Sequence, residues 1–450
     1  MRDVDVIWLI EHVARELDVA CAVCYLAEQR YGMSFEILPI KTDAKYVSAS
    51  YRPRIVAIPY GFNANNAHVR NFLPRWLEPI YLNLSWEQLF YKAYLTVKAP
   101  SDVWSRRHVI HHAWGDFYKE YLLANDVSEE HIFVNGQPAY MLYDEPYRRY
   151  FATRQEMASR FRLDTARKWI FFPENYGWGF KSQKDFDIRV RIGQFDRETL
   201  NTMSDFCRDS LKEVLQWVKD VASEGSVEFI LRPRPATNQR DFEIFVRQVI
   251  GSLPERLHII KNGTVREWIM ASDIIVSSFS TSLIEAAVAG KPAHMVEPIL
   301  IPDPLDADWY QHVTRISTRE AFLSVCLNQP DQRSSQRLRT WARAELIARG
   351  DPISNLVDFL HDLCLPGALR PPIPTLDVVT APQSAKLQPT FWRRLTNKLG
   401  SFLHSRQIVD IQQDNFDAHD ARQDDFDRAE VNRRMAAFEN VLSSEYAVRS

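Results

Sequence analysis

Short apolar runs alternate with longer amphipathic stretches through most of this chain. In the first third, the apolar runs predict strands at 4–10, 34–40, 54–59, 79–84 and 109–112, and residues 11–31 repeat apolar positions with a helical period. A second series predicts strands at 168–173, 228–232, 257–261, 274–276 and 293–296, with helices at 201–223, 241–251 and 265–271 between them. Strands that alternate with helices form parallel sheets covered on both faces. The pattern therefore predicts an α/β fold with two doubly wound, Rossmann-like domains.

The limits of these two series indicate the domain boundaries. A charged helix at 154–162 and a turn at Asp164 favour a boundary near residue 165, so we expect an N-terminal domain over 1–165 and a second domain over 166–365. Residues 366–390 are rich in proline, which is typical of an extended linker. Residues 391–450 show helical spacing of apolar positions again and predict an amphipathic tail.

Length and composition argue against several classes of protein. A chain of 450 residues is too long for a single core, and a net charge of −3 gives no sign of nucleic-acid binding. No run approaches ~20 uninterrupted apolar residues, and the N-terminal residues show no signal-peptide pattern, so we expect a cytoplasmic protein. The glycine-rich patterns of dinucleotide-binding and P-loop sites are both missing from the sequence.

The stretch 272–292 carries the most specific signal. A buried strand at 274–276 precedes a helix whose N-terminus offers unpaired N–H groups and a partial positive charge, which favour a phosphate. Glu285 lies one turn into this helix, where a carboxylate can accept hydrogen bonds from two adjacent ribose hydroxyls, and Gly290 suits the left-handed position after the helix. Hydroxyl side chains crowd the turn and add hydrogen-bond donors: Ser277, Ser278, Ser280, Thr281 and Ser282.

This run resembles the donor-nucleotide site of GT-B glycosyltransferases. The pattern D-(apolar)3-S-x-x-S-T-x-x-x-E-A-x-x-x-G-K-P of that family's second domain is matched by Asp273, Ser277, Ser280, Thr281, Glu285, Ala286, Gly290, Lys291 and Pro292. The resemblance implies two domains that face each other across a cleft, a nucleotide-sugar donor as substrate, and no metal or other cofactor. It also implies that the helix at 353–363 crosses back to the first domain. The alternative is that the Ser and Thr residues only cap a helix.

Two further segments are candidates for donor binding. Arg232 and Arg234 end the strand at 228–232, and the fork of a guanidinium matches phosphate or carboxylate oxygens. Asn175 and Gly177 follow the strand at 168–173, and glycine lets a ligand approach the backbone closely. The alternative for the two arginines is a structural role at helix ends.

The N-terminal segment "EHVARELD" carries candidate catalytic bases. It resembles the E-x-x-x-R-E-L opening of bacterial surface-polysaccharide glycosyltransferases, which makes Glu11 the first candidate for taking the proton of an acceptor hydroxyl, with His12 and Glu16 behind it. Asp116, after the strand at 109–112, is a further candidate base. The alternatives are a solvated helix face for the first three residues and an N-cap for Asp116.

Three patterns point toward metal or redox chemistry but have simpler explanations. Asp185 and Asp187 form a D-x-D, which belongs to another glycosyltransferase fold, so we interpret them as loop charges. His111 and His112 end a strand without a further cluster of ligands. The C-x-x-C at 21–24 lies within a helix pattern and has no second pair, which favours buried packing. We therefore expect no metal site.

The segment 391–406 combines an apolar helical face with flanking basic residues. Phe391, Leu395, Leu399 and Phe402 recur at helical spacing. Such a helix binds a membrane surface at headgroup level, or docks onto the protein's own body or a partner subunit, and these interpretations stay open. A lipid-linked acceptor at the inner face of the cell membrane would give a membrane anchor a purpose.

These observations lead to one expected function and two alternatives. We expect a glycosyltransferase (hexosyl, Kdo or related) that moves a sugar from a nucleotide-sugar donor to a growing surface glycan of the capsule or lipopolysaccharide type, with a lipid-linked or polysaccharide acceptor. One alternative is a polyol-phosphate transferase of the CDP-glycerol type, and the other is a catalytically silent GT-B-like scaffold. The expected partners are the donor, the acceptor and, through 391–406, a membrane surface. An oligomer is compatible with the sequence, and nucleic acid is not expected.

Overall fold

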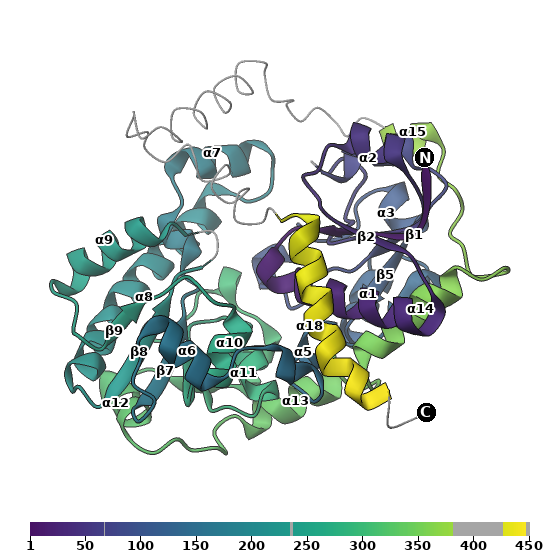
Figure 1. Ribbon diagram of the computed structural model, residues 1–450. Helices are drawn as coiled ribbons and strands as arrows, with labels where there is room; N and C mark the ends of the chain where they lie inside the picture. Colours follow the sequence, from purple (N-terminus) through teal and green to yellow (C-terminus); the bar gives the residue numbers. More distant parts are fainter. Residues whose placement is uncertain (67, 235–236, 381–425, 447–450) are drawn as a thin grey trace, which may run out of the picture. The chain divides into compact units, whose positions relative to one another are not determined.

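The computed structural model describes residues 1–66, 68–234, 237–380 and 426–446, which form two compact units (Figure 1). The first unit comprises Met1–Gln88, Lys98–Leu142 and the described residues from Ile347 onward, and the second comprises Leu89–Val97 and Tyr143–Leu346. This division differs from the expected boundaries at 165 and 365. Residues 143–165 belong to the second unit, and the chain from Ile347 onward returns to the first.

A parallel sheet forms the centre of the first unit. Within the described residues it has six strands in the order β2-β1-β3-β4-β5-β6. β1 lies between β2 and β3, with Val6 opposite Phe35 on one side and Ile55 on the other. The winding of the sheet therefore reverses between β1 and β3. The strands are β1 (Arg2–Ile10), β2 (Phe35–Pro39), β3 (Tyr51–Ile58), β4 (Ile80–Asn83), β5 (Val109–Ala113) and β6 (Ile132–Val134).

Helices of the first unit come from both ends of the chain. Helix α14, which the family resemblance expected to cross back, packs against α1, and α18 (yellow in Figure 1) also packs against α1. The helices are α1 (Asp18–Tyr31), α2 (Ala44–Ser50), α3 (Val103–Arg107), α4 (Asp116–Leu123), α5 (Pro138–Met141), α14 (Pro352–Leu363), α15 (Leu376–Thr380) and α18 (Arg428–Tyr446). Short 3-10 turns are η2 (Val69–Asn71), η3 (Leu73–Arg75) and η5 (Glu129–His131).

The C-terminal helix α18 is held by apolar packing and by ion pairs, among them Arg434 with Asp18 and Arg428 with Glu36. Val431, Phe438 and Leu442 recur at helical spacing and are buried. Arg434 donates to the carboxylate of Asp18 on α1, and both side chains are buried, at 11% and 1% exposure. The helix that the sequence predicted near the end of the tail is therefore part of the first unit.

Two parts of the first unit correct the sequence prediction. The helix expected at 11–31 begins only at Val13, with a π-helical turn, η1 (Val13–Leu17), ahead of α1. The linker expected at 366–390 contains the short helix α15. Val379 on this helix is 2% exposed and belongs to the hydrophobic core of the unit. The basic segment 391–406 lies outside the described residues.

A second parallel sheet forms the centre of the second unit. Its order is β12-β11-β10-β7-β8-β9, six strands within the part of the chain that the structure describes. Here the winding reverses between β7 and β10, which pair through Ile170 opposite Ile274. The strands are β7 (Lys168–Pro173), β8 (Val227–Arg232), β9 (Leu257–Ile259), β10 (Ile274–Ser277), β11 (Ala293–Val296) and β12 (Thr314–Ile316).

The long helix α8 is an amphipathic cover of this sheet. Val214, Leu215, Val218 and Val221 lie on its buried face. The helices of the second unit are α6 (Arg154–Phe161), α7 (Gln183–Arg191), α8 (Arg197–Ser223), α9 (Gln239–Ile250), α10 (Val265–Ala271), α11 (Ser282–Val288), α12 (Arg319–Leu327) and α13 (Gln336–Leu346). Short 3-10 turns are η4 (Lys92–Tyr94), η6 (Tyr147–Tyr150), η7 (Gly177–Phe180), η8 (Asp303–Leu305) and η9 (Asp308–His312).

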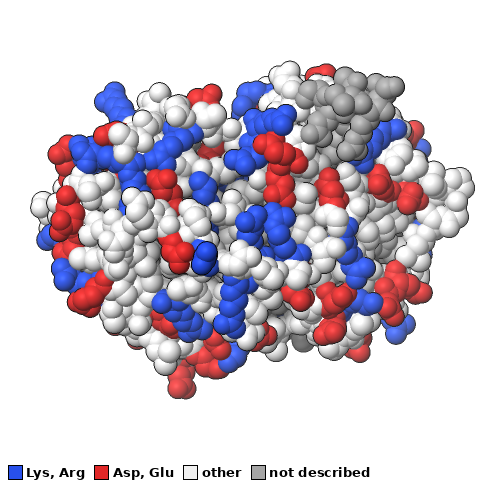
Figure 2. Space-filling model, turned by 90° about the horizontal axis from the view of Figure 1, so that it is seen from below, with Lys and Arg blue, Asp and Glu red and all other residues white. Residues whose placement is uncertain are grey.

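The two sheets confirm the predicted fold class, an α/β protein with two doubly wound parallel sheets and a C-terminal helix. Among the described residues, no helix is both long and apolar enough to span a bilayer. Figure 2 shows Lys and Arg side chains interspersed with Asp and Glu over one face of the molecule, in keeping with the small net charge of −3.

Candidate functional site

Candidate donor residues follow three neighbouring strands of the second sheet. Ser278 follows β10, Asn175 follows β7, and Arg234 follows β8. Open α/β sheets bind ligands beyond the carboxyl ends of their strands, at the point where the winding reverses. That point lies between β7 and β10, so the structure brings these three segments to the expected place.

The hydroxyl residues after β10 fall into a buried and an outer group. Ser277 and Ser278 are buried, and Ser277 Oγ donates to the carbonyl of Pro173 over 2.5 Å, which ties β10 to β7. Ser280, at 9% exposure, donates through Oγ to Ser282 Oγ over 3.2 Å. Thr281 is exposed and Ser282 is half-buried. The outer group is therefore Thr281 and Ser282, whereas Ser277, Ser278 and Ser280 are buried.

Helix α11 is short. It spans Ser282–Val288, with Thr281 as its N-cap, and the Thr281 side chain makes no capping bond. Because the macrodipole sums over aligned peptide units, a helix of seven residues is a weak source of positive charge. Anion binding here depends on side chains and on cations from neighbouring strands. The Gly290 prediction is confirmed, with φ at +75° after the helix.

Glu285 contacts Tyr143, a residue that no sequence pattern marked as a candidate. Its Oε2 accepts a hydrogen bond from the hydroxyl of Tyr143 over 2.7 Å, and the carboxylate is half-buried. The hydroxyl of Tyr143 therefore already donates to the carboxylate for which the sequence predicted ribose hydroxyls. Tyr143 shows that the geometry of Glu285 suits hydroxyl donors.

The loop after β7 is bound to its neighbours by two polar side chains. Glu174 is buried, and its carboxylate accepts the backbone N–H groups of Tyr176 and of Arg234, the latter over 3.3 Å. Burial raises the pKa of Glu174, although the nearby charge of Arg234 opposes this. Asn175 Nδ2 donates to the Tyr91 hydroxyl over 3.1 Å and to the Phe279 carbonyl over 3.3 Å. Asn175 is therefore in contact with the turn that follows β10.

Gly177 was expected to let a ligand approach the backbone closely. In the structure, the group that lies close to Gly177 is the side chain of Arg234. A β-carbon placed on Gly177 would collide with Nη1 of Arg234, and Arg234 Cδ would lie at 3.3 Å. Gly177 does not adopt the left-handed conformation, so the missing side chain is the property that matters. The glycine makes room for the Arg234 guanidinium beside the donor loop.

Arg232 and Arg234 have different environments. Arg232 is buried at 5% exposure and donates through Nη2 to the carbonyl of Gly263 over 3.1 Å. Burial lowers the pKa of Arg232 to about 10. Arg234 is half-buried. Of the two arginines predicted to meet the donor, Arg234 is the one that a ligand can reach from solvent, whereas the guanidinium of Arg232 packs toward the turn before α10.

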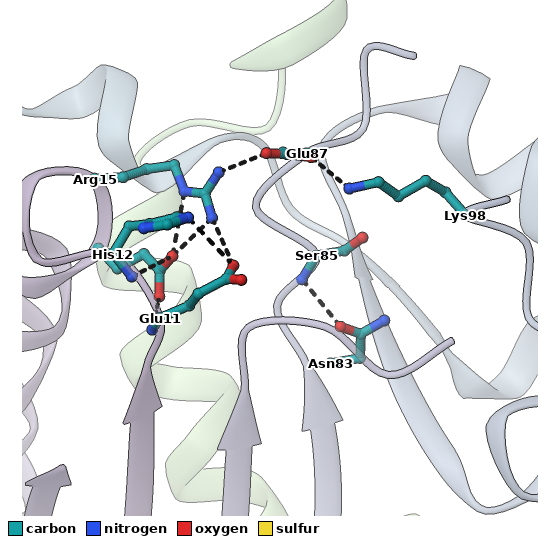
Figure 3. Close-up of polar contacts among 8 residues, drawn as sticks. Glu11, His12, Arg15, Asn83, Ser85, Glu87 and Lys98 are labelled. Atoms are coloured by element: carbon teal, nitrogen blue, oxygen red, sulfur yellow. Dashed lines mark hydrogen bonds and ion pairs between the residues drawn. The ribbon is translucent and has the colours of Figure 1, made fainter. Parts of the chain in front are cut away.

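The candidate bases lie beyond β1, where the winding of the first sheet reverses. Figure 3 shows Glu11, His12 and Arg15 grouped past the ends of the strands. Glu11 is 29% exposed and His12 is 42% exposed, and His12 Nε2 lies 3.8 Å from Glu11 Oε2. Both residues precede the helix, which begins at Val13 and not at residue 11 as expected. They therefore do not lie on a solvated helix face. They remain accessible to a substrate.

Glu16 has a different role from its neighbours. Its side chain is fully buried, and its carboxylate accepts the backbone N–H of Glu11 over 2.9 Å and that of His12 over 3.2 Å. Burial raises the pKa of Glu16, and the adjacent guanidinium of Arg15 opposes that effect. These bonds are the reason that the chain turns at residues 11–12 before η1 begins. Glu16 therefore supports the turn and is not positioned to meet an acceptor.

Asp116 is separate from this group. It is the first residue of α4, Gly115 is the N-cap, and its carboxylate is 68% exposed beside Arg349 at 3.1 Å. Asp116 follows β5, three strands along from β1, which is about 14 Å at the usual strand spacing. The structure thus brings Glu11, His12 and Glu16 together but leaves Asp116 apart, and the N-cap alternative is wrong.

The patterns that pointed toward metal or redox chemistry are accounted for by other contacts. Asp185 forms a capping box with Ser182 and Asp187 pairs with Arg197, so both lie on α7 and not in a loop. The cysteines at 21–24 are buried and free. Among the described residues, no group of three or more His, Cys, Asp or Glu side chains is placed to hold a metal ion.

His111 and His112 belong to a buried polar network. His111 Nδ1 lies 3.1 Å from Asn83 Nδ2, and His112 Nδ1 lies 3.2 Å from the carbonyl of Leu84. Burial lowers the pKa of each imidazole to about 4. Both rings are therefore neutral packing elements at neutral pH.

Four residues near these sites were not predicted. Tyr91 lies on a short excursion of the chain that belongs to the second unit, and no local pattern links it to Asn175. Glu174 stands directly before Asn175, and its position after β7 was the available signal. Tyr143 and Glu87 contact their partners only through tertiary structure.

Comparisons with known proteins found structural likenesses only. Neither a scan of family models nor a search of curated proteins finds a match to this chain. Among solved structures, the chain is similar to a UDP-GlcNAc 2-epimerase from Neisseria meningitidis bound to UDP-GlcNAc, with 10% identity over 76% of this chain and 99% of the other, at a TM-score of 0.48. It is similar to the wall teichoic acid polymerase TagF, with 11% identity over 79% and 88% and a TM-score of 0.49. It is also similar to a glycosyltransferase from Rickettsia africae, with 12% identity over 81% and 99% and a TM-score of 0.42.

Proposed function

We propose that this protein is a glycosyltransferase that moves a sugar from a nucleotide-sugar donor to a hydroxyl of a growing surface glycan. The observation that carries the proposal is the position of the 273–292 pattern. Its residues lie where the second sheet reverses its winding, and Asn175 and Arg234 join them there from the neighbouring strands. This is the place where sheets of this kind bind nucleotides.

Each donor group has a side chain of suitable chemistry. Arg234 supplies a half-buried cation for the phosphates, and a guanidinium fork pairs well with phosphate oxygens. Thr281 and Ser282 supply outer hydroxyl groups. Glu285 accepts a hydroxyl donor in the present structure, and we propose that a ribose hydroxyl replaces Tyr143 there. These side chains need no metal to stabilise a leaving nucleotide.

The acceptor would be activated by the first unit. Glu11 is accessible, and a positioned carboxylate can take the proton of the attacking hydroxyl. His12 is the second candidate, with Glu11 as its carboxylate neighbour. The proposal requires that the base reach the acceptor hydroxyl while Arg234 holds the donor.

A thermal-shift screen with CMP, CDP, UDP, GDP and dTDP tests donor binding. We expect one of these nucleotides to raise the melting temperature, and the double variant Ser280→Ala/Thr281→Ala to lose that rise. Ser48→Ala/Ser50→Ala removes two exposed hydroxyls from α2 and should keep it. A chain that no nucleotide stabilises would contradict the proposal and favour the silent scaffold.

The mass of the product then distinguishes the two transferases. With the stabilising nucleotide as its sugar conjugate and a glycan or lipid-linked glycan acceptor, we expect a mass gain of one sugar. A gain of one polyol phosphate would instead favour the CDP-glycerol type of enzyme.

Sedimentation with anionic vesicles compares the full chain with a variant in which the basic residues of 391–406 are replaced. Loss of sedimentation in that variant would support an anchor at the membrane.

A further inference from the structure

Arg15 lies at the centre of a cluster of charges beside the candidate base. Its Nη2 donates to Glu11 Oε2 over 3.2 Å and to Glu16 Oε1 over 2.8 Å, and its Nη1 donates to Glu87 Oε1 over 2.9 Å. Lys98 in turn pairs with the other oxygen of Glu87. One guanidinium therefore bridges three carboxylates from two separate segments of the first unit (Figure 3).

The ion pairs of this cluster are a weak source of stability, although Glu16 also holds the turn at residues 11–12. Glu11, Glu16 and Glu87 carry one more negative charge than Arg15 and Lys98 neutralise, and Glu16 is fully buried. Surface ion pairs contribute little and buried ones recover little beyond their desolvation. Local arrangements that bring no stability tend to mark functional sites.

Hydrogen bonds fix the backbone of the turn at 83–88, which carries Glu87. Ser85 has a left-handed backbone with φ at +47°, which is uncommon for a residue with a β-carbon. Its N–H donates to Asn83 Oδ1 over 3.1 Å, and its Oγ lies 2.8 Å from the hydroxyl of Tyr118. Strained backbone of this kind clusters at functional sites.

Gln88 fixes the other side of the same turn. Its Nε2 donates to the Ser85 carbonyl over 3.1 Å and to the His112 carbonyl over 2.9 Å, and its Oε1 accepts the N–H of Trp114 over 2.8 Å. Glu87 stands between two buried anchors but is itself 54% exposed. The buried network therefore holds in place the backbone from which Glu87 reaches Arg15.

We propose that Glu87 and Arg15 are positioning residues for Glu11: the rigid turn at 83–88 holds Glu87, Glu87 with Lys98 holds Arg15, and Arg15 fixes the carboxylate of Glu11 in its catalytic orientation. This inference rests on the proposed function for the role of Glu11. The contact chain itself is a property of the first unit. Glu87 touches no reacting group and acts through Arg15.

The kinetic test is a double-mutant cycle on wild type, Glu11→Gln, Glu87→Gln and the double variant. Loss of a general base lowers kcat about a hundredfold or more, and misplacement of that base lowers it about tenfold or more, so we expect both single variants to be slow. The KM for the donor should stay unchanged in Glu87→Gln. In the Glu11→Gln background, Glu87→Gln should have no further effect, because it acts through Glu11. Additive losses would overturn the inference.

The matched control is Glu129→Gln, which removes an exposed carboxylate from its pair with Lys119, elsewhere in the same unit. It should leave kcat unchanged. Arg15→Lys keeps the charge but loses the guanidinium fork, so it should not restore the orientation of Glu11 and should lower kcat as Glu87→Gln does. A fully active Arg15→Lys would contradict the inference.

Hydrogen exchange separates this inference from the proposed function. The N–H groups of Glu11 and His12 bond to Glu16, which Arg15 holds. In Glu87→Gln, we expect the peptide over 8–17 to lose protection about tenfold, whereas Glu129→Gln should not change it. If the wild-type protein binds no nucleotide, the proposed function is wrong. The hydrogen-exchange measurement would still test whether Glu87 holds the segment 8–17 in place through Arg15. If the peptide keeps its protection in Glu87→Gln, the inference fails whatever the activity.

Discussion

The guanidinium of Arg234 occupies the space that a side chain on Gly177 would fill. The two residues follow β7 and β8, adjacent strands of the second sheet. Glu174 strengthens this connection by accepting the backbone N–H of Arg234 over 3.3 Å. The absence of one β-carbon therefore decides where a cation lies beside the proposed donor loop.

Gly177→Ala should displace Arg234. The new β-carbon would meet Nη1, so we expect a loss of about 1–2 kcal/mol in the free energy of unfolding and about tenfold weaker nucleotide binding. Urea unfolding and calorimetric titration measure the two effects. Gly177→Ala/Arg234→Ala removes the clash and should recover the stability but not the affinity. If the single variant binds nucleotide as well as wild type, Arg234 is not the phosphate cation.

Glu285 and Tyr143 allow a test of ribose recognition. We expect Glu285→Gln to weaken nucleotide binding about tenfold, because the carboxylate would lose its strong hydrogen bonds to the two ribose hydroxyls. A 2′,3′-dideoxynucleotide should bind wild type and Glu285→Gln equally weakly. Should the dideoxynucleotide still distinguish the two proteins, Glu285 acts on another part of the donor.

Tyr143→Phe removes the hydroxyl that competes for Glu285. Loss of this bond should lower the free energy of unfolding by about 1 kcal/mol. Nucleotide binding should be equal to or tighter than that of wild type, since no internal donor then has to be displaced. Weaker binding in this variant would mean that the tyrosine hydroxyl itself contacts the donor.

His111 and His112 predict a pH-dependent stability of the first unit. Burial lowers the pKa of each imidazole to about 4, below the ordinary value of 6.5. Between these two values the unfolded chain binds more protons than the folded chain, so the free energy of unfolding falls as pH falls from 6.5 toward 4. Each histidine contributes a slope of about 1.4 kcal/mol per pH unit in that window.

Urea unfolding at pH 7.5, 6 and 5 measures this slope. His111→Asn should show a shallower decline than wild type across the same window, because one fewer imidazole then takes up a proton on unfolding. An unchanged slope in His111→Asn would contradict the assignment of a neutral buried imidazole. Above pH 6.5 these two side chains should contribute no pH dependence.

The ion pair of Asp18 and Arg434 predicts how the C-terminal helix is held. Arg434→Ala leaves the buried carboxylate of Asp18 without this partner, so we expect a loss of about 3 kcal/mol in the free energy of unfolding. Asp18→Asn/Arg434→Met removes both charges and should recover most of the loss. Thermal unfolding measures both variants. If Arg434→Ala unfolds like wild type, this ion pair does not hold α18 in place.

The amino-acid sequence by itself determined the strands and their alternation with helices. The run at 168–173 is confirmed residue for residue as β7, and those at 274–276 and 293–296 are confirmed as β10 and β11. Buried parallel strands are short continuous apolar runs, and this local property can be read without knowledge of the neighbours. The position of Gly290 after a helix is likewise a local property of the backbone.

The sequence did not determine which charged side chains share a site. Glu11 was the first candidate base in its segment, with His12 and Glu16 behind it, and burial of the Glu16 carboxylate separated it from the other two. Arg232 and Arg234 looked alike on one strand end, yet one is buried under the turn before α10 and the other lies beside Gly177. Burial depends on what packs above a residue, and that comes from distant parts of the chain.

Tertiary structure alone brought in Glu87, Tyr91, Tyr143 and the place where the final helix docks. Tyr91 meets Asn175 across 84 residues, and Arg434 meets Asp18 across 416. Local periodicity predicts an element and its buried face, because these follow from the geometry of one segment. The partner of each polar side chain is set by the order of strands in the sheet and by the paths of the loops between them, so only the folded chain decides it.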